Sequence, residues 1–218
     1  MTLRHICLVL AALASLVLAI APASAHPHVW VTVKSEILYA PDGTITGVRH
    51  AWTFDDMFSI FATQGLEAKK KGEFTREELA PLAKVNVESL KEYDFFTNAR
   101  LDGKKIEFNE PSPGYYLVFD PKETVLTLHF DLPLKTPAKG KDLSIEVFDR
   151  EYFVDFSLAE KDPAKLVGAP AQCKLTIGKP AEMGAALSQQ LSQLGPDQRN
   201  SGIAIGDEFA NKIAVKCP

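Results

Sequence analysis

The chain has 218 residues, of which 24 are Lys or Arg and 28 are Asp or Glu, so its formal net charge at pH 7 is −4. A mildly acidic chain without a basic stripe lacks the electrostatic footprint of a protein that binds nucleic acid or anionic lipid. A chain of this length can bury one good core or two small ones.

The first 25 residues predict a secretory signal peptide. A short basic start precedes an apolar run at 6–20, and Ala23-Ser24-Ala25 is a small-x-small cleavage site. The run is too short to span a bilayer, which takes roughly 20 apolar residues, and no later segment reaches that length. We therefore expect cleavage after Ala25, no membrane span in the mature chain, and a periplasmic protein that begins His26-Pro27-His28.

Two strands joined by a turn open the mature chain. Residues 28–39 and 45–54 alternate between apolar and polar side chains, which is typical of half-buried strands. The segment between them, Pro41-Asp42-Gly43, has strong turn chemistry. In the antiparallel register that we expect, His28 lies opposite the Asp55-Asp56 pair.

A helix–loop–helix insert is predicted at about 56–93, where the alternation stops and apolar residues recur at helical spacing. The loop Glu67–Glu78 has the glycine and the final glutamate of a calcium-binding EF-hand loop. However, Lys69 and Lys71 stand where that loop needs carboxylates. We expect that the loop does not bind calcium.

Short strand patterns return after the insert, at intervals typical of a β-sandwich. The expected strands are 95–101, 105–108, 114–120, 125–132, 143–148, 152–158 and 173–177. Prolines are expected to interrupt them, residues 159–171 to form a linker, and residues 181–194 to form a polar helix. The predicted class is mainly β (α+β): an antiparallel β-sandwich-like domain at 26–160 with the helical insert, and a small C-terminal appendage at 161–218.

Two cysteines remain after Cys7 leaves with the signal peptide. In an oxidising compartment Cys173 and Cys217 admit one intramolecular pairing. Two free thiols or a metal-binding pair are the alternatives. We expect a disulfide, which would tie the C-terminal appendage.

The predicted N-terminus is rich in metal donors. The free α-amine and the imidazoles of His26 and His28 are three nitrogen donors that suit copper, nickel, zinc or cobalt. The square-planar complex that uses two deprotonated amides cannot form, because Pro27 has no amide hydrogen. Further ligands must therefore come from elsewhere in the fold.

Three residues are predicted to complete this site. His129 lies on a polar strand face, Asp55 is near His28 in the expected hairpin, and Asp149 lies in a bend between strands. Asp55 could equally be the N-cap of the following helix. The sequence favours a structural role for His50 and leaves open whether it joins the site.

Enzyme motifs are missing from the sequence. It contains no nucleophile elbow, zinc-peptidase, P-loop or dinucleotide-binding motif. We therefore expect no catalytic activity.

Four segments resemble an uncharacterised family of bacterial periplasmic proteins: His26–Val31, Trp52–Ser59, Leu126–Leu134 and Phe148–Phe156. That family is labelled as a periplasmic component of an ABC-type transport system, and its genes often lie near nickel/cobalt permeases. The resemblance implies an accessory protein that binds a divalent zinc, nickel or cobalt ion and serves a membrane metal transporter or permease. A solute receptor of the usual kind is not expected, because the chain lacks alternating strand–helix units.

Two other functions stay open at this stage. The chain could be a non-catalytic β-sandwich adaptor that binds a protein partner, with its histidines only structural. It could also be a copper protein in which the terminal amine and His26 form a brace, with His129 as the third nitrogen donor.

Overall fold

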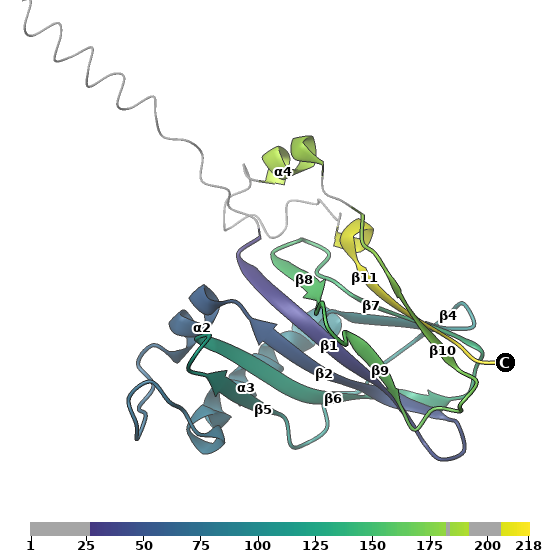
Figure 1. Ribbon diagram of the computed structural model, residues 1–218, viewed down its shortest axis with the longest axis horizontal. Helices are drawn as coiled ribbons and strands as arrows, with labels where there is room; N and C mark the ends of the chain where they lie inside the picture. Colours follow the sequence, from purple (N-terminus) through teal and green to yellow (C-terminus); the bar gives the residue numbers. More distant parts are fainter. Residues whose placement is uncertain (1–26, 182–183, 192–205) are drawn as a thin grey trace, which may run out of the picture.

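Two β-sheets packed face to face form the body of the protein (Figure 1). The computed structural model describes residues 27–181, 184–191 and 206–218. The strands are β1 (Val29–Tyr39), β2 (Ile45–Phe54), β3 (Thr97–Leu101), β4 (Lys104–Ile106), β5 (Tyr116–Asp120), β6 (Val125–Ala138), β7 (Asp142–Val147), β8 (Val154–Leu158), β9 (Ala164–Val167), β10 (Lys174–Gly178) and β11 (Asn211–Lys216). The helices are α2 (Asp56–Thr63), α3 (Arg76–Leu90) and α4 (Ala185–Leu191), with short 3-10 segments η1 (Lys91–Phe96) and η2 (Gly206–Phe209).

The first sheet has the order β5-β6-β2-β1-β8, and β9 also pairs with β1; the second has the order β10-β11-β7-β3-β4. Strand β1 pairs antiparallel with β2 but parallel with β8 and β9. The predicted mainly β, sandwich-like class is therefore confirmed, as is the helix–loop–helix insert between β2 and β3.

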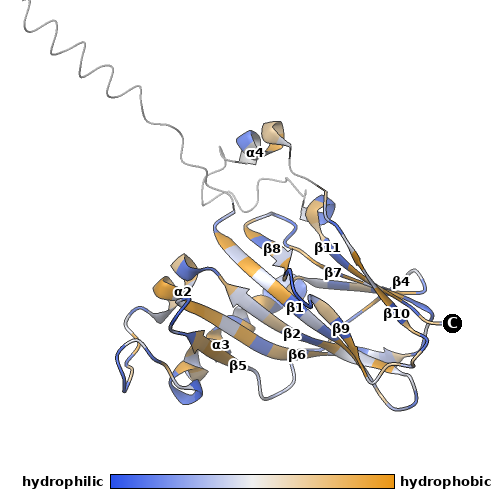
Figure 2. Cartoon of the chain, viewed as in Figure 1, coloured by the Kyte–Doolittle hydropathy of each residue, from blue (hydrophilic) through white to orange (hydrophobic). Residues whose placement is uncertain are grey.

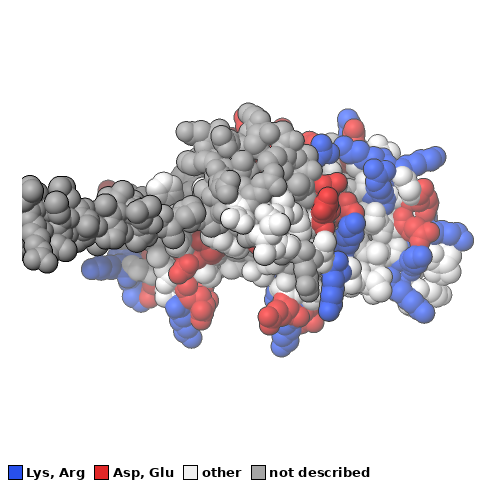
Figure 3. Space-filling view, turned by 90° about the horizontal axis from the view of Figure 1, so that it is seen from above, with Lys and Arg blue, Asp and Glu red and all other residues white. Residues whose placement is uncertain are grey.

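The inward faces of both sheets supply the core, and the apolar stripes along the strands are visible in Figure 2. Trp52 of β2 is its central aromatic residue, with its ring edge-on to the rings of Phe130 and Phe156 at 5.0 Å in each case. Helix α3 buries Leu79, Ala83 and Val87 on one face, at i, i+4 and i+8, and contacts β5. Most charged groups lie outside; Figure 3 shows basic and acidic side chains interspersed over one such surface.

Helix α3 begins with a capping box that also closes the preceding loop. The Thr75 hydroxyl accepts from the Glu78 backbone N–H, and the Glu78 carboxylate accepts from the N–H groups of Thr75 and Lys69, both at 2.8 Å. The acid that would bind calcium in an EF-hand loop therefore holds the loop backbone instead.

The hairpin register differs from the expected one. Val31 is level with Phe54, and a bulge lies between Leu38 and Tyr39. Asp55 therefore lies beside Trp30, two residues further along β1 than His28. A bulge adds a residue to one strand only and shifts every pair beyond it.

The C-terminal segment is part of the sandwich. The stretch expected to be a linker contains β9, which pairs with β1, and the expected appendage supplies β11, which lies between β10 and β7. Strand β6 also continues through Pro133 and Pro137, where interruption was expected. Both prolines lie beyond the part of β6 that pairs with β5, where a missing N–H is tolerated.

The predicted disulfide between Cys173 and Cys217 is present, with an S–S distance of 2.03 Å. It joins the start of β10 to the end of β11 and so fastens the last strand of the chain. Within the described residues, no helix is long and apolar enough to cross a membrane.

Candidate functional site

His28 lies at the start of β1, beside the loop that leads into β8. Its backbone N–H donates to the Phe153 carbonyl at 2.9 Å, and its ring packs against the Phe153 ring at 4.5 Å between centroids. Trp30, two residues on, is on the same face of the sheet and 48% exposed. His26, the other predicted N-terminal ligand, lies outside the described residues.

Two carboxylates flank Trp30 on the neighbouring strands. Asp55 lies beside it at the end of β2, and Asp155 is level with it on β8. Side chains that are level in a sheet lie on the same face, so both acids lie about 7 Å from His28 measured along the strands.

Of the two roles that the sequence left open for Asp55, the structure shows that of the helix N-cap. Its carboxylate accepts from the Phe58 N–H at 2.8 Å, which confirms it as the N-cap of α2. The other carboxylate oxygen accepts from the Trp30 N–H at 2.9 Å, and the Asp55 N–H donates to the Trp30 carbonyl. Asp55 therefore fixes α2 to the start of β1.

Asp155 was missed at the sequence level, although its segment belongs to one of the quoted motifs. Burial raises the pKa of its carboxyl, and a hydrogen bond from the Tyr152 hydroxyl partly offsets that effect. Burial, together with the charge and the hydrogen bond of Asp155, raises the pKa of Tyr152 to about 12. Asp155 forms no ion pair with any described Lys, Arg or His. A cation bound beside this half-buried carboxylate would therefore stabilise its charged form.

Asp149 is directed into its own loop. It is buried, and its carboxylate accepts backbone N–H groups from Glu151, Phe153 and Val154, each at 3.0 Å. These three bonds shape the loop that places Phe153 beside His28. Its role is to hold this loop rather than to bind an ion at the surface.

His129 is far from His28. It is level with Ala51 on β2, which is level with Lys34 on β1. Six residues of extended chain therefore separate the two histidines, or about 20 Å along the strands. One metal ion cannot bind both, so the predicted set of ligands has to lose His129.

The His129 ring already packs against other side chains of the protein. Its ring stacks on Tyr116 at 4.7 Å, and the Arg76 guanidinium lies 3.7 Å from the centre of the same Tyr116 ring. Partial burial and the charge of Arg76 lower the pKa of His129.

His50 is fully buried and does not join the surface site. Its Nδ1 is 3.0 Å from the Ser35 hydroxyl, and its Nε2 is 3.3 Å from the Thr97 hydroxyl. Since the Thr97 hydroxyl donates its one hydrogen to the Phe95 carbonyl, Nε2 must carry the imidazole hydrogen and Nδ1 must accept from Ser35. Burial lowers the pKa of His50 to about 3.

Within the described part of the chain, no three His, Cys, Asp or Glu side chains are grouped closely enough to hold a metal ion. A complete site at the start of β1 would need donors that lie before Pro27. His28, Asp155 and Asp55 are the described groups that could contribute to it.

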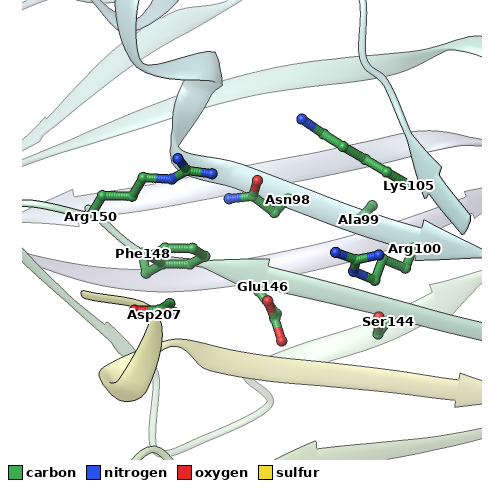
Figure 4. A pocket seen from close by; sticks show the side chains of 9 residues that line it. All are labelled: Asn98, Ala99, Arg100, Lys105, Ser144, Glu146, Phe148, Arg150 and Asp207. Atoms are coloured by element: carbon green, nitrogen blue, oxygen red, sulfur yellow. The ribbon is translucent and has the colours of Figure 1, made fainter. Parts of the chain in front are cut away.

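Two cavities are lined in part by residues of the loop around Asp149. One, of about 310 Å³, lies under the start of β1 and has mainly apolar walls, many of them aromatic. The other, of about 380 Å³, is a depression on the outer face of the second sheet, and its lining includes Arg100, Arg150 and Lys105 as well as Glu146 and Asp207 (Figure 4). Charges of both signs line this depression, so it has no clear preference for an anion or a cation.

Comparison with known proteins gives relatives without an assigned activity. An uncharacterised protein of Haemophilus influenzae is 24% identical over 196 residues, which cover 88% of this chain and 91% of the relative. An uncharacterised 15.5 kDa protein in the trpE 3' region of Spirochaeta aurantia is 29% identical over 122 residues, covering 56% of this chain and 80% of that protein. A family model described as a protein of unknown function, DUF1007, matches residues 11–217, and the chain therefore belongs to this family.

Proposed function

We propose that the protein is an exported accessory protein that binds a divalent zinc, nickel or cobalt ion as cargo and serves a membrane metal transporter or permease. The observation that carries the proposal is the position of His28. It is the third residue after the predicted cleavage site, and it shares one face of the first sheet with the half-buried Asp155 and with Asp55.

The donor set suits these metals. After cleavage at Ala25, the terminal amine and the His26 imidazole would lie two residues from His28. Imidazoles with a carboxylate favour zinc, nickel or cobalt over Cu(I), which prefers thiolate or thioether donors. We propose His26, His28 and Asp155 as ligands, with Asp55 as the alternative carboxylate.

Export to the periplasm is part of the proposal. The signal-like sequence at 1–25 supports it, and the Cys173–Cys217 disulfide is typical of an oxidising compartment.

The test is metal stoichiometry of protein with an authentic His26 terminus. Wild type should bind one Zn²⁺, and His28→Ala should lose it. His129→Ala is the matched control and should bind as wild type does, because its ring is remote. Since histidine must be neutral to coordinate, binding should weaken as the pH falls through about 6.5.

Equal binding by wild type and His28→Ala, or no binding by either, would refute the proposal. Loss of metal by His129→Ala, with His28→Ala unaffected, would place the site elsewhere on the sheet.

A second function, that of an adaptor for a protein partner, is supported by one observation. Helix α2 exposes Met57, Ile60 and Phe61 on one face, with Met57 and Phe61 each 75% exposed. This apolar face and the metal site would lie at the same end of the molecule. A metal-free protein that still binds the periplasmic face of a transporter, and loses that binding in Phe61→Ser, would favour the adaptor function.

A further inference from the structure

The aromatic cavity under the start of β1 has the features of a small-molecule site. Its floor is formed by buried core residues, Trp52, Phe96 and Phe156 among them. The lining also includes Phe153, in the loop before β8, and Tyr93, in η1, which is 36% exposed. A volume of about 310 Å³ is at the lower end of the range for small-molecule pockets.

A polar group in this lining has no partner. The Trp52 side chain is 1% exposed, and its indole N–H is buried without an acceptor among the described residues. Buried Trp N–H groups in folded proteins usually have an acceptor, because leaving a donor unmade in the interior is costly. Because Trp52 also contributes to the lining, this unpaired donor belongs to the wall that a bound molecule would contact.

The charge of the lining selects the sign of that molecule. Glu92 and Glu151 lie in the lining, and neither forms an ion pair within the part of the chain that the structure describes. The third acid, Asp149, is already satisfied by three backbone N–H groups. The lining includes no Lys, Arg or His, and aromatic faces also attract cations.

The wall at η1 is held in a costly conformation. Asp94, Phe95 and Phe96 have φ values of 49°, 53° and 48°, in the left-handed region that non-glycine residues avoid. This turn lets the ring of Phe96 lie stacked on that of Tyr93 at 5.0 Å, at the edge of the cavity. Strain of this kind is concentrated at binding sites in proteins, where the surrounding fold maintains it.

We infer that this cavity binds a small organic cation that has an aromatic or branched apolar body and a carbonyl-type acceptor. The apolar body packs against the aromatic side chains of the walls, and the acceptor accepts a hydrogen bond from the Trp52 N–H. The cationic group lies near Glu92 and Glu151. The inference does not depend on the proposed metal site, since none of the proposed metal ligands lines the cavity.

The probe is L-phenylalaninamide, which combines an aromatic ring, an ammonium group and an amide carbonyl. Binding is followed by NMR through the indole N–H signal of Trp52, at about pH 6, where the amine is protonated. The chain has two tryptophans, so Trp30→Phe leaves a single indole signal and assigns it. We expect saturable displacement of that signal, and weaker binding of the anion N-acetyl-L-phenylalaninate.

Substitution at the acids tests the charge selection without changing the core. Glu92→Gln with Glu151→Gln should weaken phenylalaninamide binding about tenfold, because two nearby unit charges are lost. The neutral N-acetyl-L-phenylalaninamide should be affected little. Glu123→Gln, a change of the same kind at an exposed turn, is the matched control and should leave binding unchanged.

An indole signal that stays in place with every probe would overturn the inference, because the cavity then holds only water. Equal binding of the cation and the anion, or equal effects of the paired and control substitutions, would overturn the assignment of a cationic ligand. Loss of metal binding in the His28 variant, with probe binding unchanged, would show that the cavity binds its ligand independently of the metal site.

Discussion

Acid is expected to destabilise the protein through the buried imidazole of His50. Its pKa is lowered to about 3, whereas an unfolded chain has a histidine pKa near 6.5. Between these values the unfolded chain binds a proton that the native protein does not. The contribution of a neutral His50 to stability is therefore fully present above about pH 6.5 and is lost as the pH falls.

The size of the effect follows from the two pKa values. Linkage makes the unfolding free energy fall by up to about 1.4 kcal/mol per pH unit in this window. Between pH 7 and pH 5 the loss attributable to His50 is about 2 kcal/mol. The charge of Asp131 opposes the shift less strongly than burial favours it, and the groups in contact with the ring are the hydroxyls of Ser35 and Thr97 and the rings of Trp52 and Phe130.

Urea unfolding at pH 7, 6 and 5 measures this loss, with His50→Gln as the comparison. Glutamine can accept from Ser35 and donate to Thr97 but does not titrate. The unfolding free energy of His50→Gln should therefore fall less steeply with decreasing pH than that of wild type. The two slopes should differ by about 1 kcal/mol per pH unit. His129→Gln should change the slope less, because that ring is only half-buried. A His50→Gln slope as steep as that of wild type would refute the reasoning.

Four further outcomes are expected. Replacing Cys173 and Cys217 by serine should lower the unfolding free energy by about 4 kcal/mol in the chain-entropy model, as measured by urea unfolding. Calcium should leave the melting temperature unchanged, because Glu78 already binds the loop backbone; calorimetric binding tighter than about millimolar would contradict this. Asp149→Asn should destabilise by about 2 kcal/mol through lost charge-assisted hydrogen bonds, with zinc stoichiometry unaltered. Intact mass of exported protein should match a chain that begins at His26; a longer mass would disprove cleavage after Ala25.

Local patterns in the sequence predicted most of the elements. The alternation in β1 and β2 and the helical spacing in α3 reflect which side chains are buried, and burial repeats with the period of each element. The sequence also predicted the N-cap role of Asp55 as an alternative and the Cys173–Cys217 disulfide, because each depends on few residues.

Pairings between strands that are distant in the chain could not be predicted from the sequence. Tyr39 rather than Leu38 pairs with Ile45, and the bulge at Leu38/Tyr39 shifts the pairs beyond it by one more residue, so that together these two differences moved Asp55 from His28 to Trp30. Strand β9 looked like a linker, since four residues at the side of a sheet carry no clear alternation. The separation of His28 from His129 depends on strand order and register together, so the predicted ligand set combined residues from opposite ends of the sheet.

The parallel pairing of β1 has a consequence for how the chain folds. The strand is the first to be synthesised, yet Val29 pairs with Val154 and Ser35 with Ala164. The first sheet therefore cannot close until most of the chain has followed, and such long-range pairing makes folding slow. A protein built in this way keeps its first sheet open while the chain emerges, which would suit the export that we propose. The end of the sheet that we propose to bind metal needs both β1 and the loop before β8, so it would form only after most of the chain has emerged.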